Sequence, residues 1–173
     1  GDPLAEDRNW SREPMLALLR LTQQFGERFL ERKRADGVMD FHDLEQFALE
    51  LLWDRETRQP TGLARRWRDK FHFVFVDEYQ DINAAQDRIL TALSRDGAEA
   101  NRFLVGDVKQ SIYRFRLADP GIFRRYAKDW QREAGQTISL AENFRSRATI
   151  LEFVNAVFTP LMHADIGGVD YDE

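Results

Sequence analysis

One stretch, residues 71–83 (FHFVFVDEYQDIN), constrains the fold more than any other part of the chain. Residues 73–76 form an apolar run that is too short for a helix and rich in β-branched and aromatic side chains, which predicts a buried strand. Two carboxylates, Asp77 and Glu78, follow the strand at once. Because ligands bind outside the carboxyl ends of the strands in an open parallel sheet, this acid pair is placed to work on a ligand. The plain alternative is a strand that ends in solvated acids.

The rest of the chain predicts helices that alternate with short strands, which is the pattern of an α/β fold with a parallel sheet. Helix signals include a proline in a first turn near residues 11–14, an N-cap at Asp40 with Asp43 three residues on, and an N-cap at Asn83. The predicted helices cover residues 14–36, 41–52, 63–70, 84–96, 120–134 and 147–161, and the predicted strands cover 73–76, 103–106 and 137–140. The apolar stripe of the second helix, which begins at Phe41, predicts a core face.

The composition excludes several kinds of chemistry. The 173 residues contain no cysteine, which excludes disulfides, thiolate metal sites and a cysteine nucleophile among them and is compatible with a reducing cytoplasm. Hydrophobic residues make up 43% and charged residues 32%, as in an ordinary globular protein. No apolar run approaches the ~20 residues that span a bilayer. We therefore expect a cytoplasmic protein with no membrane partner.

The charge balance does not by itself indicate nucleic-acid binding. The formal net charge is −5, although a local basic patch can matter more than the total. Basic residues cluster within 32–34, 65–70 and 114–125. Each cluster, judged alone, is more typical of a solvated helix face than of a phosphate-binding track.

Each predicted strand is followed by polar residues of the kinds that phosphate chemistry uses. Asp77 and Glu78 follow the first strand, Asp107 and Gln110 follow the second, and Arg145 follows the third. An acid pair can hold Mg²⁺ together with phosphate oxygens and water, and the second acid can reach an attacking water. An amide can hydrogen-bond a phosphate oxygen and that water, and a guanidinium offers a planar fork to a phosphoryl group. Together the strand ends indicate a nucleotide site.

Several segments also resemble those of a known family. VDEYQDIN (76–83), GDVKQSIYRFR (106–116) and LAENFRS (140–146) resemble motifs II, III and IV of superfamily 1 DNA helicases of the UvrD/Rep type. MDFHDLE (39–45) is similar to an element that lies upstream in that group. Within the family, the spelling of GDVKQSIYRFR, ADPGIF, NFRSR and GGVDYDE is most similar to the AddA-type helicase–nuclease subunits of double-strand-break repair, to which the RecB type is closely related. The resemblance runs from about residue 15 to the last residue.

The resemblance implies a partial RecA-like motor domain with a parallel sheet and flanking helices. Residues 1–38 would be the helical end of an inserted subdomain, 39–141 the second half of the first motor domain, and 142–173 the start of the second. The resemblance also implies ATP and Mg²⁺ as cofactors, single- and double-stranded DNA as partners, and an AddB-type partner subunit. The intact protein would couple ATP hydrolysis to movement on single-stranded DNA.

Carried over residue by residue, the resemblance implies roles at the nucleotide. Asp77 and Glu78 would form the Mg²⁺ site, with Asp77 holding the ion through water and Glu78 activating the hydrolytic water. Gln110 would sense the γ-phosphate and couple it to DNA. Arg145 would be an arginine finger that reaches the nucleotide from the neighbouring motor domain.

The resemblance also implies a DNA-binding segment. Tyr113 and Phe115 would offer aromatic faces to unstacked bases, a contact worth roughly 1–3 kcal/mol per base that tolerates any sequence. Arg114 and Arg116 would add positive charge along the DNA backbone. The alternative for the two aromatic residues is ordinary packing. Asp81 and Asn83 are expected to hold their loop by local hydrogen bonds.

Several parts of the family are missing from these residues: the phosphate-binding loop, motifs V and VI, and the nuclease domain of the AddA type. No segment matches GxxxxGK[ST], the loop whose backbone N–H groups and lysine cradle the phosphates. We therefore expect the chain to be an internal piece of a longer protein, and expect it alone to hydrolyse ATP feebly or not at all, because this catalysis is mostly positioning and electrostatics.

Two other interpretations remain open at this point. The chain could be a degenerate motor domain that binds DNA or protein as a scaffold, although the presence of Asp77, Glu78, Gln110 and Arg145 argues against degeneration. It could instead carry a metal-dependent nuclease cluster made by Asp77, Glu78 and Asp107. The nuclease interpretation leaves Gln110 and the asparagine–arginine element unexplained.

Overall fold

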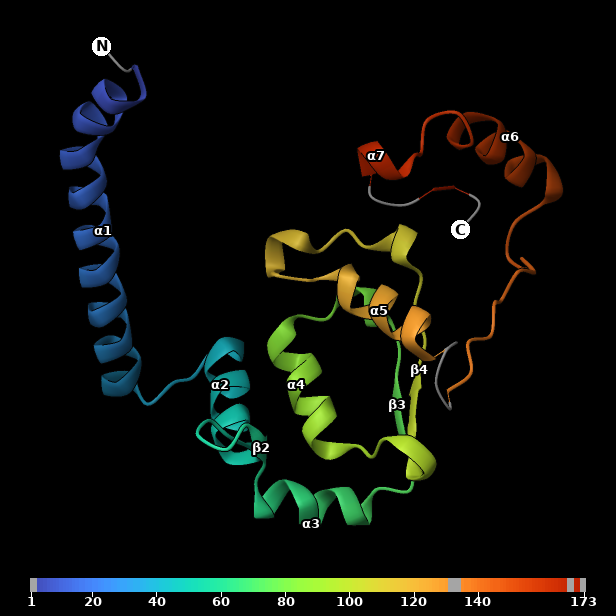
Figure 1. The fold of residues 1–173 in the computed structure, drawn as a ribbon, viewed down its shortest axis with the longest axis horizontal. Helices are drawn as coiled ribbons and strands as arrows, with labels where there is room; N and C mark the ends of the chain where they lie inside the picture. The colour runs from blue at the N-terminus through green and yellow to red at the C-terminus, as the bar shows by residue number, and fades with distance from the viewer. Residues whose placement is uncertain (1–2, 131–134, 168–169, 172–173) are drawn as a thin grey trace. The chain divides into compact units, whose positions relative to one another are not determined.

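A computed structural model describes residues 3–130, 135–167 and 170–171. Two compact units, residues 1–44 and 45–173, are described separately. The elements are α1 (Pro3–Asp36), α2 (Phe41–Leu52), β1 (Trp53–Asp54), β2 (Gln59–Pro60), α3 (Gly62–Lys70), β3 (Val74–Val76), the 3₁₀ turn η1 (Tyr79–Asp81), α4 (Ala84–Leu93), η2 (Gly97–Glu99), β4 (Arg102–Leu104), η3 (Val108–Gln110), η4 (Arg114–Arg116), α5 (Pro120–Trp130), α6 (Ala148–Phe158) and α7 (Ala164–Gly167) (Figure 1).

The first unit consists of α1 and the start of α2. The prediction that α1 starts at residues 11–14 is wrong, because the helix begins at Pro3 and contains Pro14 in its interior. A proline inside a helix removes one backbone hydrogen bond and is costly, but it does not forbid the helix. The predicted stop is confirmed, since Gly37 follows the helix with a φ of 65°, a left-handed conformation that glycine adopts without strain.

The start of α2 is held by a reciprocal capping arrangement, as the sequence predicts. The backbone N–H of Asp43 donates to Asp40 Oδ1 at 2.9 Å, and the backbone N–H of Asp40 donates to Asp43 Oδ2 at 3.0 Å. Lys33 Nζ bridges the two carboxylates, at 3.0 Å from Asp40 and 2.7 Å from Asp43. These contacts lower the pKa of both aspartates, for Asp40 mainly through the Asp43 N–H and for Asp43 mainly through Lys33.

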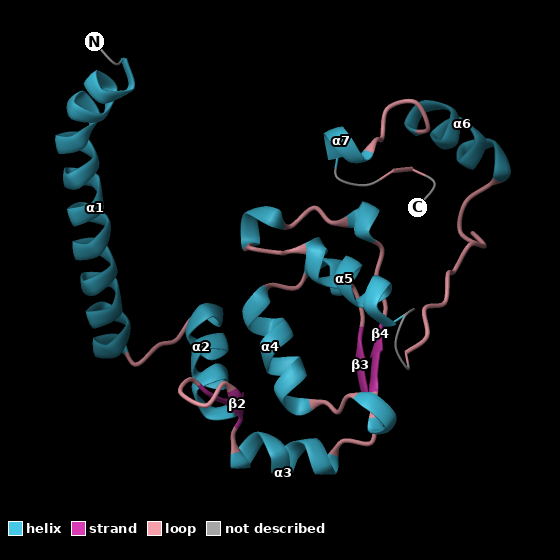
Figure 2. Cartoon of the chain, viewed as in Figure 1, coloured by secondary structure: helices cyan, strands magenta, loops and turns pink. Residues whose placement is uncertain are grey.

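The second unit contains a parallel pair of strands, β3 and β4 (Figure 2). Val74, Phe75 and Val76 pair with residues 102, 103 and 104 in register. The parallel direction confirms the predicted sheet type. The described chain is thus a mixed helix-and-strand structure with a small parallel sheet, while β1 and β2 form a separate antiparallel pair.

One face of the parallel pair forms the core of this unit. Tyr79, Ile82 and Ile122 are buried, and Val76 and Leu104 pack against them. Leu90 of α4 and Phe123 and Tyr126 of α5 pack against the same cluster. Residues two apart in a strand share a face, so the valines of β3 point into the core and Phe75 lies on the opposite face.

The prediction that both strands are buried is wrong for this opposite face of the sheet, which is exposed. Phe73, Phe75 and Phe103 are 70%, 71% and 50% exposed, and the Phe75 ring contacts the other two at centroid distances of 5.8 and 5.7 Å. The apolar stripe of α2 is likewise exposed rather than core, with Phe41 86% exposed. An apolar pattern shows that a face can pack, but it does not show whether a neighbouring element covers it.

The prediction of a third strand over residues 137–140 is wrong. Residues 135–140 are described without strand structure, and Ile138 and Leu140 are exposed. A strand needs a partner for its backbone N–H and C=O groups, and no described strand pairs with residues 137–140. The Thr137 hydroxyl donates to the Ala127 carbonyl of α5 at 3.1 Å. The predicted helices over 120–134 and 147–161 correspond to the shorter α5 and α6, and residues 131–134 lie outside the described part of the chain.

Asn83 caps α4, as the sequence predicts. Its Oδ1 accepts from the Gln86 N–H at 2.9 Å, while Gln86 Oε1 accepts from the Asn83 N–H at 3.1 Å, which completes a capping box. The side-chain amides of both residues also donate to Glu45, at 3.1 Å from Asn83 and 2.7 Å from Gln86. The segment 76–83 is therefore joined to Glu45, the last residue of the upstream segment 39–45.

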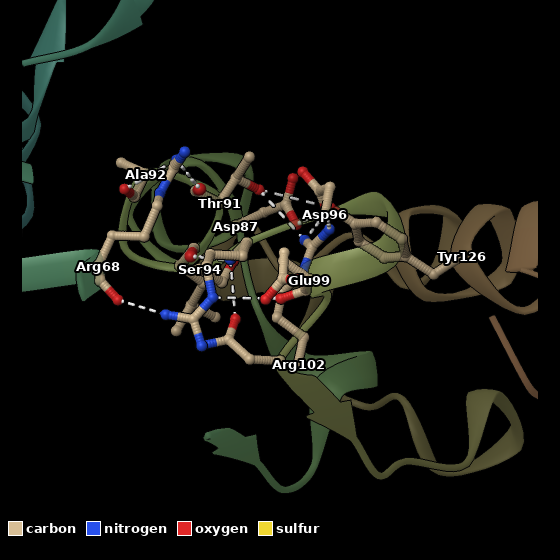
Figure 3. Close-up of polar contacts among 12 residues, drawn as sticks. Arg68, Asp87, Thr91, Ala92, Ser94, Asp96, Glu99, Arg102 and Tyr126 are labelled. Atoms are coloured by element: carbon tan, nitrogen blue, oxygen red, sulfur yellow. Dashed lines mark hydrogen bonds and ion pairs between the residues drawn. The ribbon is translucent and has the colours of Figure 1, made fainter. Parts of the chain in front are cut away.

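The other end of α4 is held by Arg68 (Figure 3). Arg68 donates to the carbonyl oxygens of Thr91 and Ala92 at 3.0 and 3.1 Å, so it satisfies backbone acceptors that the helix end leaves free. The Arg102 side chain is nearly buried. It donates to Tyr126 Oη at 3.0 Å and forms an ion pair with Asp96. The prediction of a solvated basic face over residues 65–70 is therefore wrong for Arg68.

Candidate active site

The acid pair lies where β3 ends. Asp77 Oδ1 accepts from the backbone N–H of Glu78 at 2.9 Å, and both side chains are exposed. Glu78 has φ 51° and ψ 42°, the left-handed conformation, which costs about 1–3 kcal/mol for a residue other than glycine. This strained residue turns the chain from the strand into η1 and presents two carboxylates at the sheet edge.

The loop after β4 comes to the same edge because the two strands are parallel neighbours. The N–H of Tyr79 donates to the Val105 carbonyl at 2.9 Å, just beyond the paired residues Val76 and Leu104. The carboxyl ends of both strands therefore open on one side, as expected for a ligand-binding edge. The structure brings the Asp77–Glu78 pair and the segment that contains Gln110 together there.

Gln110 lies in η3 and contacts the acid that precedes it. Asp107 Oδ2 accepts from Gln110 Nε2 at 3.0 Å, and Asp107 Oδ1 accepts from the Lys109 N–H at 3.0 Å. Gln110 is exposed, so its amide is accessible to a ligand. Asp107 acts as the cap of this short turn, which is a different role from the metal ligand of the nuclease interpretation.

Sequence reasoning missed Gln80, which connects the two loops. Gln80 is 1% exposed. Its Nε2 donates to Glu78 Oε2 at 2.7 Å, and its Oε1 accepts from the Asp107 N–H at 2.9 Å. The sequence does show a glutamine between the acid pair and the cap of α4. Its role depends on Asp107, which lies 27 residues away in the sequence, so spacing along the chain could not indicate it.

Three of the predicted DNA-binding residues, Arg114, Phe115 and Arg116, form η4, and Tyr113 directly precedes it. Tyr113 and Phe115 have ring centroids 5.9 Å apart, and the Arg116 guanidinium lies 5.3 and 5.6 Å from the two rings. Phe115 is 76% exposed and Tyr113 is 38% exposed, and Arg114 is exposed as well. Exposed aromatic rings beside a cation suit stacking on unpaired bases.

Arg145 lies in a turn with local contacts. Asn143 Oδ1 accepts from the backbone N–H groups of Arg145 and Ser146 at 3.0 and 2.9 Å, a turn that asparagine commonly forms. The Arg145 side chain is exposed. Among the hydrogen bonds and ion pairs of the described residues, none joins this turn to the loops after β3 and β4.

The donor set at the sheet edge fits a magnesium nucleotide. Mg²⁺ in nucleotide sites takes one or two carboxylates and leaves its other positions to phosphate oxygens and water. Asp77 and Glu78 supply such hard oxygen donors, and Asp81 in the same loop keeps a buried Oδ1 that has no hydrogen-bond partner in the described part of the chain. Among the described residues, no group of three or more His, Cys, Asp or Glu side chains is placed to hold a metal ion.

None of the helices within the described residues combines the length and apolar character needed to cross a membrane.

Comparisons with known proteins agree with the motifs. Residues 7–131 match the model of the UvrD/REP helicase N-terminal domain. Several ATP-dependent helicase/nuclease subunits of the AddA type are similar to the chain. That of Exiguobacterium sibiricum is 46% identical over 158 residues, covering 90% of this chain and 13% of the relative. That of Alkaliphilus oremlandii is 44% identical over 171 residues, covering 97% and 14%. That of Bacillus cereus AH187 is 44% identical over 162 residues, covering 90% and 13%.

The chain therefore spans about one seventh of the length of these relatives. The family match covers most of the chain, and it includes the ends of β3 and β4 together with η4 and α5. The chain belongs to the UvrD/REP helicase family, and its residues 7–131 match the N-terminal domain of that family.

Proposed function

We propose that this chain is part of the ATP-hydrolysing motor of a DNA helicase, and that the ends of β3 and β4 form part of its nucleotide site. The observation that carries the proposal is the hydrogen-bonded path from Glu78 through Gln80 to Asp107 and Gln110. The relatives are named ATP-dependent helicase/nuclease subunits, and the chain covers 13–14% of them. The activity is therefore proposed for the longer protein that contains this segment.

At the nucleotide, Asp77 and Glu78 would hold Mg²⁺, which when bound supplies charge neutralisation to the phosphate oxygens. Glu78 would also orient the attacking water and accept its proton. Gln110 would hydrogen-bond the γ-phosphate, so its amide would sense whether that group is present. This division of work matches phosphoryl transfer in general, where positioning and electrostatics supply most of the catalysis.

Arg145 would complete the site from a second motor domain. Its planar guanidinium would stabilise charge on the transferred phosphoryl group after the two domains close. This role requires the domain boundaries implied by the motifs, with the first motor domain within 39–141, the second beginning at 142, and the inserted helical subdomain ending near 38.

The DNA would pass over η4. Tyr113 and Phe115 would stack on bases of single-stranded DNA, and Arg114 and Arg116 would contact its backbone. The exposed ring of Phe115 supports this role. Since η4 follows η3 by only a few residues, Gln110 lies on the segment that carries the DNA-binding residues, which would couple nucleotide state to DNA contact. An AddB-type protein is the expected partner in the whole assembly.

The test is Glu78→Gln in the full-length protein. We expect ATP hydrolysis in the presence of Mg²⁺ and single-stranded DNA to fall by about 10²–10⁴-fold, the range for loss of a general base, with DNA binding retained. Glu99→Gln is the matched control, because Glu99 is an exposed acid on η2 and receives the same substitution. Hydrolysis that survives Glu78→Gln unchanged would contradict the proposal.

The two alternatives give different results in the same experiments. A scaffold without turnover would show no Mg-ATP hydrolysis in the full-length protein. A nuclease centred on Asp77, Glu78 and Asp107 would cleave DNA with Mg²⁺ in the absence of ATP, and Asp107→Asn would abolish that cleavage. For the 173-residue chain by itself we expect little or no turnover, because it carries no GxxxxGK[ST] loop.

A further inference from the structure

Gln80 is the most deeply buried polar side chain near the candidate site, and the proposed function uses its hydrogen bonds without assigning the residue a role of its own. It is 1% exposed and lies in η1, between the acid pair and α4. We propose that Gln80 is a positioning residue that holds the Glu78 carboxylate and the Asp107–Gln110 loop in one arrangement. This inference rests on the proposed function and assigns to the same site a residue that acts through Glu78 and Gln110.

The contacts of Gln80 use both halves of its amide. Nε2 donates to Glu78 Oε2 at 2.7 Å, and Oε1 accepts from the Asp107 N–H at 2.9 Å. Its backbone carbonyl accepts from Ser111 Oγ at 3.3 Å, which adds a second tie to the loop after β4. An ionised glutamate could accept from the Asp107 N–H but could not donate to Glu78, and an apolar side chain could do neither.

The surroundings leave Gln80 little freedom. A Cβ at Gly106 would lie 2.6 Å from Gln80 Oε1, so the glycine makes room for the amide oxygen. That same Cβ would lie 3.1 Å from Phe123 and 3.2 Å from the Tyr79 backbone nitrogen, which shows how closely the pocket is packed. A side chain held by packing and by hydrogen bonds at both ends can transmit a fixed geometry to the groups it contacts.

The path continues to the predicted γ-phosphate sensor. Asp107, whose N–H is held by Gln80, accepts from Gln110 Nε2 at 3.0 Å. Glu78 itself is exposed and lies on a strained turn, so its carboxylate needs a partner to keep one orientation. Gln80 supplies that partner and at the same time fixes the backbone from which Gln110 extends.

The experiment compares two variants at this position in the full-length protein. Gln80→Glu keeps the acceptor for Asp107 and loses the donor to Glu78, whereas Gln80→Met has a similar size and loses both. We expect the kcat of DNA-stimulated Mg-ATP hydrolysis to fall by about 10–100-fold, the usual effect of losing a partner that orients a ligand or catalytic group, with the KM for ATP changed by less than about twofold. Gln80→Glu should show the larger fall, because it places a buried carboxylate beside the carboxylates of Glu78 and Asp81.

Gln86→Glu is the matched control. Gln86 Nε2 also donates to a glutamate, Glu45 Oε1, at 2.7 Å, but it does so on α4 at the cap of the helix. The exchange is chemically the same as Gln80→Glu, so it reports the cost to stability alone. We expect Gln86→Glu to lower the melting temperature while kcat per folded molecule stays within about twofold of wild type.

The outcomes separate this inference from the proposed function. If the wild-type protein hydrolyses ATP, Glu78→Gln abolishes the hydrolysis and both Gln80 variants keep the wild-type kcat, the positioning role is refuted while the proposed function stands. The positioning role is also refuted if the Gln80 variants lose activity only in proportion to lost folded protein, as Gln86→Glu would. If the wild-type protein shows no Mg-ATP hydrolysis, the proposed function fails, and this inference fails with it.

Discussion

Replacing Gly106 by alanine would place a methyl group in the space that the Gln80 amide occupies. The added Cβ would lie 2.6 Å from Gln80 Oε1, a separation that carbon and oxygen do not tolerate. Gln80 cannot simply move away, because it is 1% exposed and its Oε1 accepts the Asp107 N–H at 2.9 Å. Gly106 does not have a positive φ, so alanine would not strain the backbone itself. The cost comes from packing.

The opposing contributions can be compared in magnitude. Overpacking a filled site costs about 1–3 kcal/mol, and displacing the Gln80 oxygen leaves the Asp107 N–H without its partner, which adds about 1 kcal/mol or more. Against this, an alanine restricts the unfolded chain and stabilises by about 0.4–1 kcal/mol. The destabilising contributions are larger, so we expect Gly106→Ala to reduce the free energy of unfolding by about 2 kcal/mol.

Urea denaturation, together with hydrogen exchange at the Asp107 amide, measures this effect. Gly106→Ala should lower the urea midpoint and speed exchange at Asp107, whose N–H loses its acceptor. Gly62→Ala is the control: Gly62 begins α3, and a Cβ there would meet no atom within 4 Å. It should be neutral or stabilising by up to about 1 kcal/mol. A Gly106→Ala protein with the wild-type midpoint and a protected Asp107 amide would refute the reasoning.

Two further predictions concern buried and capped carboxylates. Tyr79→Phe removes the hydroxyl that donates to Asp87 Oδ1 at 2.7 Å. Because hydrogen bonds to charged groups are worth about 1.5–3 kcal/mol, we expect the free energy of unfolding to fall by an amount near the lower end of that range. An unchanged urea midpoint would contradict this prediction. The contacts with Lys33 and the capping N–H groups hold the pKa of Asp43 and Asp40 below the ordinary value of 3.8. Their contribution to stability is present above pH 3.8 and is lost as the pH falls through the lower folded-state pKa. Exchange at the Asp43 amide, which donates to Asp40 Oδ1, should accelerate in that acid range, and Asp40→Asn should remove most of the acid dependence.

The features that sequence reasoning predicted correctly are local ones. Asn83 as the cap of α4 and Asp40 with Asp43 at the start of α2 depend on residues three positions apart, so the chain itself brings the partners together. Gly37 as the end of α1 depends on its own conformational freedom. The apolar runs at β3 and β4 likewise predicted strands, and their parallel pairing follows from the helix between them.

The features that it predicted wrongly depend on distant neighbours. Residues 137–140 have the composition of a strand, but no described strand pairs with them. Phe75 has the composition of a buried strand and is 71% exposed, because its face of the sheet is not the one that α4 and α5 pack against. Arg68 belongs to a basic cluster in the sequence, yet it caps a helix end more than 20 residues away.

By itself, the sequence determined the family, the two strands that end in polar loops and the helix caps, while the roles of Asp77, Glu78, Gln110 and Arg145 stay predictions. The family, the strands and the caps depend on residue type and on spacing along the chain, which hold before folding. Only the tertiary structure decided that Gln80 ties Glu78 to the loop of Gln110, because that contact joins residues 27 positions apart around a glycine. A hydrogen bond of that kind exists only after two parallel strands have placed their carboxyl ends side by side.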